Sequence, residues 1–254
     1  MSRLFSLQDQ VILVTGASRG LGLAMATAMA EAGALVILNG RDPQTLQQAA
    51  AALHARGLKA EIAPFDVADF AVAAREVAAI AERHGRLDAV VLNAGVNHRR
   101  PLLEWQTEDF QRVLDINLTG CFVLAREAAR AMLPRRAGRI IFTGSIMGIV
   151  ARPTIHAYAA AKAGLGGMAK TLAAELAPHG ITVNVICPGF FVTEMNTTLM
   201  QSAEFDAWVK SRCPLGRWAE PEELGGAAVF LASAAGSYVT GHMLVVDGGL
   251  TINA

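Results

Sequence analysis

Short apolar runs recur along the chain, and longer segments of mixed apolar and polar residues separate them. Each run is continuously apolar, without the alternation of a half-exposed strand, which is typical of parallel strands buried on both faces. The seven runs are residues 11–15, 35–38, 59–64, 87–92, 139–143, 181–186 and 243–246. Because strand-like and helix-like segments alternate throughout, the pattern predicts an α/β fold with a doubly wound parallel sheet of about seven strands flanked by helices.

The segments between these runs are predicted to be helices. Asp42 as N-cap and Pro43 at the first helical position open one of them. The expected helices cover residues 23–32, 42–56, 71–83, 108–133, 156–177 and 221–232. No linker, repeat or low-complexity stretch divides the chain, so residues 1–254 are expected to form a single domain. Residues 188–217 are long, aromatic and bounded by Gly and Pro, which suits a lid over a substrate site.

Composition narrows the class of protein. Apolar residues make up 53%, enough for a large core, and the formal net charge is zero. That balance argues against a nucleic-acid-binding or membrane-binding surface. Cys121, Cys187 and Cys213 are widely spaced in apolar segments, so neither a metal site nor a disulfide framework is expected. A reducing, cytoplasmic location fits best, because the N-terminus also lacks the apolar core of a signal peptide.

Residues 224–246 contain no Asp, Glu, Lys or Arg and are long enough to raise the question of a membrane span. Gly236, Gly241 and His242 interrupt this stretch. A buried helix followed by a buried strand therefore explains it better.

A glycine-rich turn lies between the first predicted strand and the first predicted helix, with Gly16, Gly20 and Gly22. Glycines there permit a tight turn and close backbone approach, and the helix N-terminus presents free N–H groups to a diphosphate. The spacing is G-x-x-x-G-x-G instead of the more usual G-x-G-x-x-G. In this strand–turn–helix position it predicts nucleotide binding and a Rossmann-type sheet, with an ordinary glycine-rich turn as the alternative.

Charged residues near this turn favour NADP over NAD. A cation after the second strand would hold the 2′-phosphate of NADP, whereas an acid would hold the 2′-OH of NAD. Arg41 and Arg19 are the cations, although both are also compatible with solvated surface charges. Asp66 and Asn93 follow the third and fourth strands. Asp66 is expected near the adenine, and Asn93 either contacts the cofactor or ties adjacent strand ends together.

Tyr158 and Lys162 lie one helical turn apart, so their side chains emerge on the same helix face. The Lys162 ammonium would favour the ionised phenol, which makes Tyr158 a candidate acid and base. The spacing alone is usually that of a solvated helix face, so its meaning depends on the rest of the chain.

With these residues in view, the chain resembles the short-chain dehydrogenase/reductase family over essentially its full length. The matching motifs are Thr15-Gly-Ala-Ser-Arg-Gly-Leu-Gly, Asp66-Val, Asn93-Ala-Gly, Asn117, Ser145, Tyr158-x-x-x-Lys162 and Pro188-Gly. The resemblance implies an NAD(P)-dependent oxidoreductase that interconverts a secondary alcohol and a ketone. It also implies a homotetramer formed through two long helices.

The resemblance implies a catalytic set of Asn117, Ser145, Tyr158 and Lys162, and no metal ion. Tyr158 would donate the proton, Ser145 would hold the carbonyl oxygen, and Asn117 would interrupt its helix to hold a water that links Lys162 to solvent. The implied cofactor contacts, with the two arginines added, are Gly16, Ser18, Arg19, Gly20, Leu21, Gly22, Arg41, Asp66, Val67, Asn93, Ala94, Gly95, Tyr158, Lys162, Pro188, Gly189, Phe191 and Thr193.

Within the family the chain looks most like gluconate 5-dehydrogenases, for example in Val36-Ile-Leu-Asn-Gly-Arg, Arg99-Arg-Pro and Arg217-Trp. This implies gluconate, 5-ketogluconate or a related polyol as substrate. Arg99 is then the candidate partner of a substrate carboxylate, with an exposed loop arginine as the alternative. Weaker candidates for substrate contact are Met147, Arg152 and His156.

Other functions remain open. Ile146, Met147 and Ile149 are more apolar than expected after the serine of that group. They leave room for a 3-oxoacyl-thioester reductase or for a reductase of small apolar or cyclic ketones. A non-catalytic NADP-binding scaffold is the alternative from a different class, and the intact Asn-Ser-Tyr-Lys set argues against it.

Overall fold

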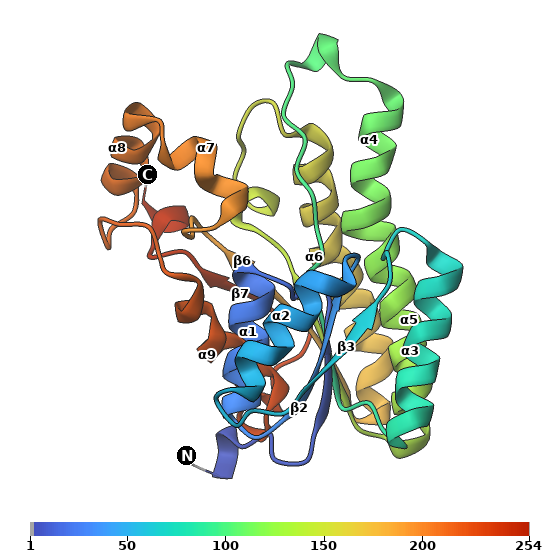
Figure 1. The fold of residues 1–254 in the computed structure, drawn as a ribbon. Coiled ribbons are helices and arrows are strands. Elements are labelled where there is room, and N and C mark those ends of the chain that lie inside the picture. The colour runs from blue at the N-terminus through green and yellow to red at the C-terminus, as the bar shows by residue number, and fades with distance from the viewer. Residues whose placement is uncertain (1–2, 254) are drawn as a thin grey trace.

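The computed structural model describes residues 3–253, and its centre is a sheet of seven parallel strands (Figure 1). The strands are ordered β3-β2-β1-β4-β5-β6-β7, so the chain starts in the middle and builds outward in both directions. Their bounds are β1 Val11–Val14, β2 Leu35–Gly40, β3 Ala60–Pro64, β4 Ala89–Leu92, β5 Gly138–Thr143, β6 Ile181–Pro188 and β7 Met243–Val246. The predicted fold class is confirmed.

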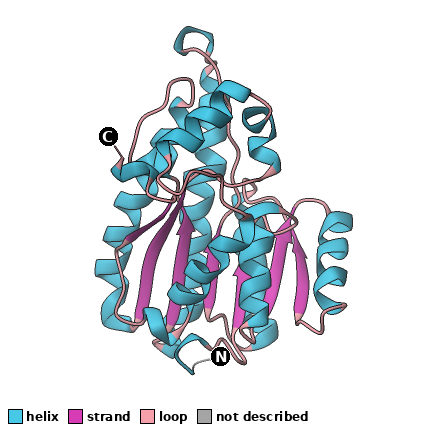
Figure 2. Ribbon diagram, turned by 90° about the vertical axis from the view of Figure 1, so that its left-hand side faces the viewer, coloured by secondary structure: helices cyan, strands magenta, loops and turns pink. Residues whose placement is uncertain are grey.

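Helices cover both faces of the sheet, as Figure 2 shows. One core contains side chains of α3 (Phe70–His84), α5 (Gly120–Met132) and α6 (His156–Leu176). The other contains side chains of α1 (Gly20–Glu31), α2 (Pro43–His54) and α9 (Gly225–Ala232). In β1, Leu13 belongs to the first core, while Ile12 and Val14 belong to the second. Burial on both faces is why the central strands consist mostly of apolar residues.

Three predicted helices differ in detail from the observed ones. The first begins at Gly20, three residues early, because the glycine turn is itself the helix start. The segment predicted as one helix over 108–133 consists of α4 (Thr107–Leu114), a π-helical segment (Asp115–Thr119) and α5. The helix predicted over 221–232 opens with a 3₁₀ turn (Pro221–Leu224) before α9. At α2 the prediction holds, since Asp42 accepts from the Gln44 N–H and caps the helix.

The segment after β6 rises above the carboxyl ends of the strands, where α7 (Thr197–Met200) and α8 (Ala203–Arg212) are labelled in Figure 1. Its aromatic side chains pack on one another: Phe190 makes edge contacts with Phe205, Trp208 and Trp218. Phe190, Phe205, Trp208 and the adjoining Trp218 thus form one cluster, whereas Phe191 packs in the second core.

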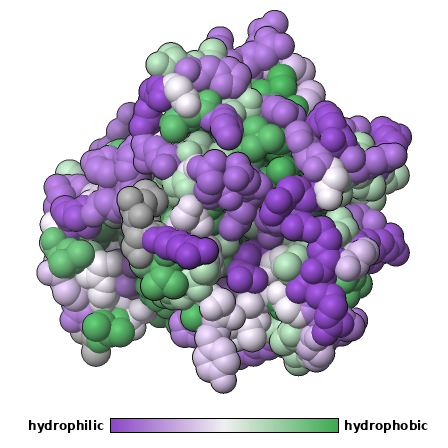
Figure 3. Space-filling view, turned by 90° about the horizontal axis from the view of Figure 1, so that it is seen from below, coloured by the Kyte–Doolittle hydropathy of each residue, from purple (hydrophilic) through white to green (hydrophobic). Residues whose placement is uncertain are grey.

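No helix within residues 3–253 is long and apolar enough to cross a membrane. The uncharged stretch 224–246 contains α9 and then β7, as the sequence indicates. The three cysteines are buried and unpaired. Seen from below in Figure 3, the end of the molecule opposite α7 and α8 is mostly polar, with apolar residues scattered between.

Candidate active site

A cavity of about 620 Å³ opens at the carboxyl ends of the strands. It is lined by every predicted cofactor-binding residue and by the predicted catalytic residues Ser145, Tyr158 and Lys162. Of the candidates for substrate contact, Arg99, Met147 and Arg152 line it. Asn117 and His156 do not line the cavity. The fold thus brings segments from both halves of the chain into one site.

The glycine turn has the shape that a diphosphate requires. Gly16 and Gly20 adopt left-handed backbone conformations, with φ of +61° and +56°. A Cβ on Gly22 would lie 2.2 Å from the Gly16 carbonyl oxygen, so only glycine lets α1 pack this closely against the turn. The glycines leave room for a ligand to approach the backbone N–H groups at the N-terminus of α1, where Arg19 and Leu21 also line the cavity. These residues fit a dinucleotide, held by backbone N–H groups at the helix N-terminus.

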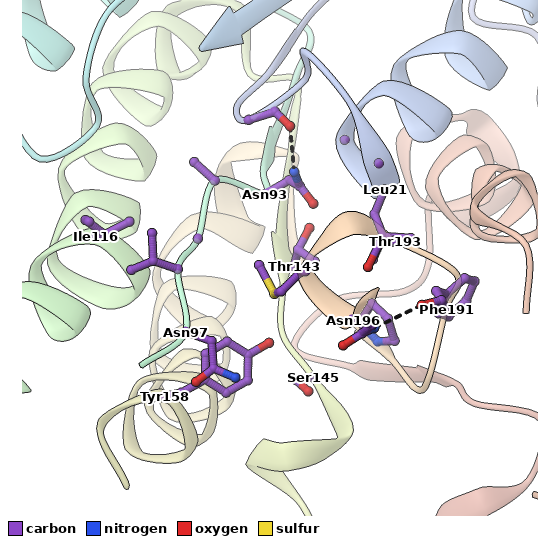
Figure 4. Close-up of a pocket in the computed structure, with 18 of the residues that line it drawn as sticks. Leu21, Asn93, Asn97, Ile116, Thr143, Ser145, Tyr158, Phe191, Thr193 and Asn196 are labelled. Carbon is purple, nitrogen blue, oxygen red and sulfur yellow. Dashed lines mark hydrogen bonds between the residues drawn. The ribbon is translucent and has the colours of Figure 1, made fainter. Parts of the chain in front are cut away.

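Asn93 ties the ends of two strands together, one of the two roles considered for it. Its Nδ2 donates to the carbonyl oxygens of Thr15 at 3.0 Å and Gly16 at 3.2 Å. The Thr15 hydroxyl in turn accepts from the backbone N–H groups of Asn93 and Ala94. Figure 4 shows this side chain at the cavity wall beside the turn. Asn93 thereby fixes the glycine turn to the end of β4.

The two arginines at the nucleotide end lie near carboxylates. Arg19 pairs with Glu194 at 3.0 Å, and Nη1 of Arg41 lies 4.0 Å from Oδ2 of Asp66. The side chains of both arginines are more than 70% exposed, so these pairs are weak and leave both guanidinium groups available. Oδ1 of Asp66 accepts from the Ala68 N–H at 2.9 Å, which fixes the carboxylate at the end of β3.

At the other end of the cavity, Lys162 is buried beside Tyr158. Nζ of Lys162 donates to the Thr143 carbonyl oxygen at 2.6 Å and lies 5.5 Å from the centroid of the Tyr158 ring. The Ser145 hydroxyl accepts from the Met147 N–H at 3.1 Å, which caps a short 3₁₀ turn (Ile146–Gly148). Figure 4 shows Tyr158 and Ser145 in the same part of the cavity. The site therefore holds a phenol, a hydroxyl and an ammonium close together.

Asn117 is the fully buried centre of the π-helical segment. Its Nδ2 donates to the carbonyl oxygens of Val113 at 2.8 Å and Val96 at 2.9 Å, and its Oδ1 accepts from the Val96 N–H at 3.2 Å. The side-chain amide bonds the Val113 carbonyl of its own helix, which in an α-helix would accept from a backbone N–H group. It also holds the loop after β4, where a Cβ on Gly95 would lie 3.7 Å from Nζ of Lys162.

Two half-buried arginines lie beyond Tyr158. Burial lowers the pKa of Arg99, and the nearby Tyr158 hydroxyl opposes that shift. Burial also lowers the pKa of Arg152, and the charge of Arg99 adds to the effect. Nε of Arg99 is buried and has no hydrogen-bond partner in the described chain. Within residues 3–253 neither arginine forms an ion pair, so this end of the cavity carries uncompensated positive charge.

The structure also places the remaining candidates. Nε2 of His156 is buried and has no hydrogen-bond partner among residues 3–253, and its ring centroid lies 6.0 Å from that of Trp105. Ile149 is 48% exposed and does not line the cavity, whereas Ile146 and Met147 do. Within the described residues, no group of three or more His, Cys, Asp or Glu side chains is placed to hold a metal ion.

Several residues of the cavity wall were not predicted from the sequence as site residues, including Asn97, Thr143, Phe190, Glu194 and Asn196. Thr143 ends a predicted strand, and Asn97 follows the Asn93 motif by four residues, so strand-end position was a usable signal for both. Phe190, Glu194 and Asn196 belong to the lid segment, where the sequence pattern has no periodicity to orient them.

Comparison with known proteins identifies the family. The family model for enoyl-(acyl carrier protein) reductases matches residues 16–251. The gluconate 5-dehydrogenase of Gluconobacter oxydans (strain 621H) is 42% identical over 250 residues, which are 98% of either chain. This chain is a short-chain dehydrogenase/reductase.

Other members of the family are similar over the same length. The 5-keto-D-gluconate 5-reductase of Escherichia coli (strain K12) is 38% identical to this dehydrogenase/reductase, over 99% of both chains. The crystal structure of a gluconate 5-dehydrogenase from Burkholderia cenocepacia J2315 in complex with NADP and tartrate has a TM-score of 0.96, 40% identity and 99% coverage of both chains. The chain is accordingly an NAD(P)-dependent oxidoreductase that acts on a CH–OH group.

Proposed function

We propose that this dehydrogenase/reductase interconverts gluconate and 5-ketogluconate, or a closely related polyol acid, with NADP(H) as preferred cofactor. The observation that carries the substrate class is the pair of half-buried arginines beside Tyr158, which lack any carboxylate partner among residues 3–253. Buried cations without a counter-charge are costly, and a substrate carboxylate would supply that charge.

Three side chains act on the reacting oxygen and its proton in this proposal, and a fourth positions them. In reduction, Tyr158 gives its proton to the substrate oxygen while Ser145 donates a hydrogen bond that orients the same oxygen. Lys162, already bonded to the Thr143 carbonyl, holds the Tyr158 phenol in a positive field and keeps two donors free for the nicotinamide ribose. Asn117 holds the loop after β4 through Val96, and its interrupted helix would hold a water that links Lys162 to solvent. Bound NADP(H) supplies the hydride chemistry.

The preference for NADP rests on Arg19 and Arg41. Both are exposed at the nucleotide end of the cavity, and each forms only a weak, solvent-screened pair. A 2′-phosphate carries more charge than these carboxylates and would bind to both guanidinium groups. Arg41→Ala should therefore raise the KM for NADPH about tenfold or more and leave that for NADH nearly unchanged.

The acid–base assignment is tested by Tyr158→Phe, which removes the hydroxyl and keeps the ring. Loss of a general acid lowers turnover by about a hundred- to ten-thousand-fold. NADPH binding, measured by fluorescence titration, should stay nearly unchanged. A Tyr158→Phe enzyme that turns over at the wild-type rate would exclude this role.

The substrate is tested by a panel of 5-ketogluconate, an acetoacetyl thioester and a cyclic diketone, each with NADPH and NADH. Ile146 and Met147 in the cavity wall favour a 3-oxoacyl thioester or a small apolar ketone as the second candidate. In wild-type enzyme 5-ketogluconate should give the highest kcat/KM. Arg99→Ala should raise the KM for this acid far more than that for the neutral diketone, whereas equal effects would contradict the carboxylate contact.

The same proposal includes a single catalytic domain, a cytoplasmic location, residues 188–217 as a lid, and a homotetramer. Support for the lid comes from Phe190, Thr193 and Leu199, which line the cavity from this segment. Sedimentation of the purified protein tests the tetramer.

A further inference from the structure

Arg152 is held by a contact that crosses from the catalytic core to α8. Its guanidinium carbon lies 4.3 Å from the centroid of the Phe205 ring, a cation–π distance. The two residues belong to different segments: Arg152 lies in the loop between Ser145 and α6, and Phe205 lies in the first turn of α8. Among the described residues, Arg152 forms no ion pair.

Phe205 is fixed by its aromatic neighbours. Its ring is stacked on Trp208 at a centroid distance of 5.3 Å and meets Phe190 edge-on at 5.5 Å. Trp218 lies 6.3 Å away and is itself anchored, because its Nε1 donates to Oδ1 of Asp206 at 2.9 Å. A ring held on several sides is a rigid surface for the arginine that lies over it.

A guanidinium over an aromatic ring presents its charge through the face and keeps its N–H groups directed outward in its plane. Those N–H groups can form the paired bonds that a carboxylate accepts. Holding the long side chain on a fixed ring also removes the rotamer freedom that binding would otherwise have to remove. A preformed Arg152 gains affinity for an anion without gaining any for a neutral substrate.

We propose that Phe205 is a positioning residue that sets the preference of this enzyme for acid substrates by holding Arg152 toward Arg99. This inference rests on the proposed function, because it assigns the substrate carboxylate to the two arginines. It adds that the selectivity depends on a ring in α8 that does not line the cavity.

The test compares Phe205→Leu with Phe205→Tyr, which keeps the ring. Steady-state kinetics with NADPH would use 5-ketogluconate and 5-ketofructose, a neutral polyol ketone. Phe205→Leu should raise the KM for 5-ketogluconate about three- to thirty-fold, the range that a partly desolvated cation–π contact sustains. The KM for 5-ketofructose and the KM for NADPH should change less than twofold, and Phe205→Tyr should restore the wild-type KM for the acid.

An Arg152→Ala background separates positioning from general packing. In that background Phe205→Leu should no longer change the KM for 5-ketogluconate, because the positioned group is gone. Equal increases of both ketone KM values, or an undiminished effect in the Arg152→Ala background, would overturn the proposal.

The same variants distinguish failure of the role of Phe205 from failure of the proposed function. If Arg152→Ala and Arg99→Ala raise the KM for the acid while Phe205→Leu does not, the carboxylate contact stands and the role of Phe205 is wrong. Should neither arginine variant affect the acid, the carboxylate assignment itself fails. Calorimetric binding of D-gluconate to the NADP⁺-loaded Tyr158→Phe enzyme reports the same comparisons without turnover. If the protein with intact arginines binds no gluconate, both proposals are overturned.

Discussion

Gly22 is a position where a single methyl group should displace the nucleotide turn. A Cβ there would lie 2.2 Å from the Gly16 carbonyl oxygen and 2.5 Å from Nδ2 of Asn93. The first atom is backbone, and the second is held by hydrogen bonds to Thr15 and Gly16. Neither atom can rotate away, so Gly22→Ala must push α1 and the turn apart.

The size of the effect follows from this geometry. Unstrained contacts between heavy atoms are about 3.5 Å, so the turn and the helix must separate by roughly 1 Å. Overpacking of this kind costs about 1–3 kcal/mol. Because the turn and the N-terminus of α1 are the parts that would hold the diphosphate, most of that cost should appear in cofactor binding. It corresponds to an increase of roughly 5- to 150-fold in the Kd for NADPH.

Fluorescence titration with NADPH measures this Kd directly. The matched control is Gly226→Ala in α9, where a Cβ meets nothing within 4 Å, and its Kd should equal that of the wild type. Circular dichroism would confirm that both variants are folded. A wild-type Kd in folded Gly22→Ala protein would refute the argument that this glycine is required for close packing at the nucleotide turn.

Three further predictions concern the buried framework. Asn117→Ala leaves three polar atoms of Val113 and Val96 without their partner, so unfolding in urea should show a loss of at least about 1–3 kcal/mol, together with lower kcat. Burial alone would raise the pKa of Asp88, but its bonds to Arg86, the Val11 N–H and Arg135 hold it below the usual 3.8. That stabilisation is complete above pH 3.8 and is lost as the pH falls through the folded-state value, so the stability gap between wild type and Asp88→Asn should narrow below pH 4. Burial raises the pKa of Cys121 and Cys187 to about 11, so neither thiol of the native enzyme should react with a disulfide reagent at pH 8, and rapid labelling at either would contradict their burial.

The layout of the sheet was predictable because each strand carries its own signal. A strand buried on both faces needs continuous apolar sequence, and all seven predicted runs overlap an observed strand. The π-helical segment around Asn117, by contrast, could not be predicted from the periodic pattern. Periodicity cannot distinguish an α-helical from a π-helical turn. The Asn117 amide bonds the Val113 carbonyl of its own helix and also Val96, which lies 21 residues earlier, and neither bond leaves a mark in the periodic pattern. The resemblance to a family implied the interruption, whereas the periodic pattern did not.

The lid segment shows the same limit more clearly. Its aromatic content and its Gly and Pro boundaries predicted an unusual segment between 188 and 217, but not where its side chains would point. The contact between Arg152 and Phe205 joins residues 53 positions apart and depends on how α8 packs over the cavity. No local pattern encodes such a contact, so it emerges only once the chain is folded.

Charge is distributed unequally between the two ends of the cavity. At the nucleotide end, Arg19 and Arg41 are exposed, and each has a carboxylate within 4.0 Å. At the other end, Lys162 is buried, and Arg99 and Arg152 are half-buried with no carboxylate partner among the described residues. Solvent screens the charges of the two exposed arginines. The charges of the lysine and the two half-buried arginines have no negative partner until an anion binds. An acid substrate therefore gains more from this end of the cavity than a neutral ketone does.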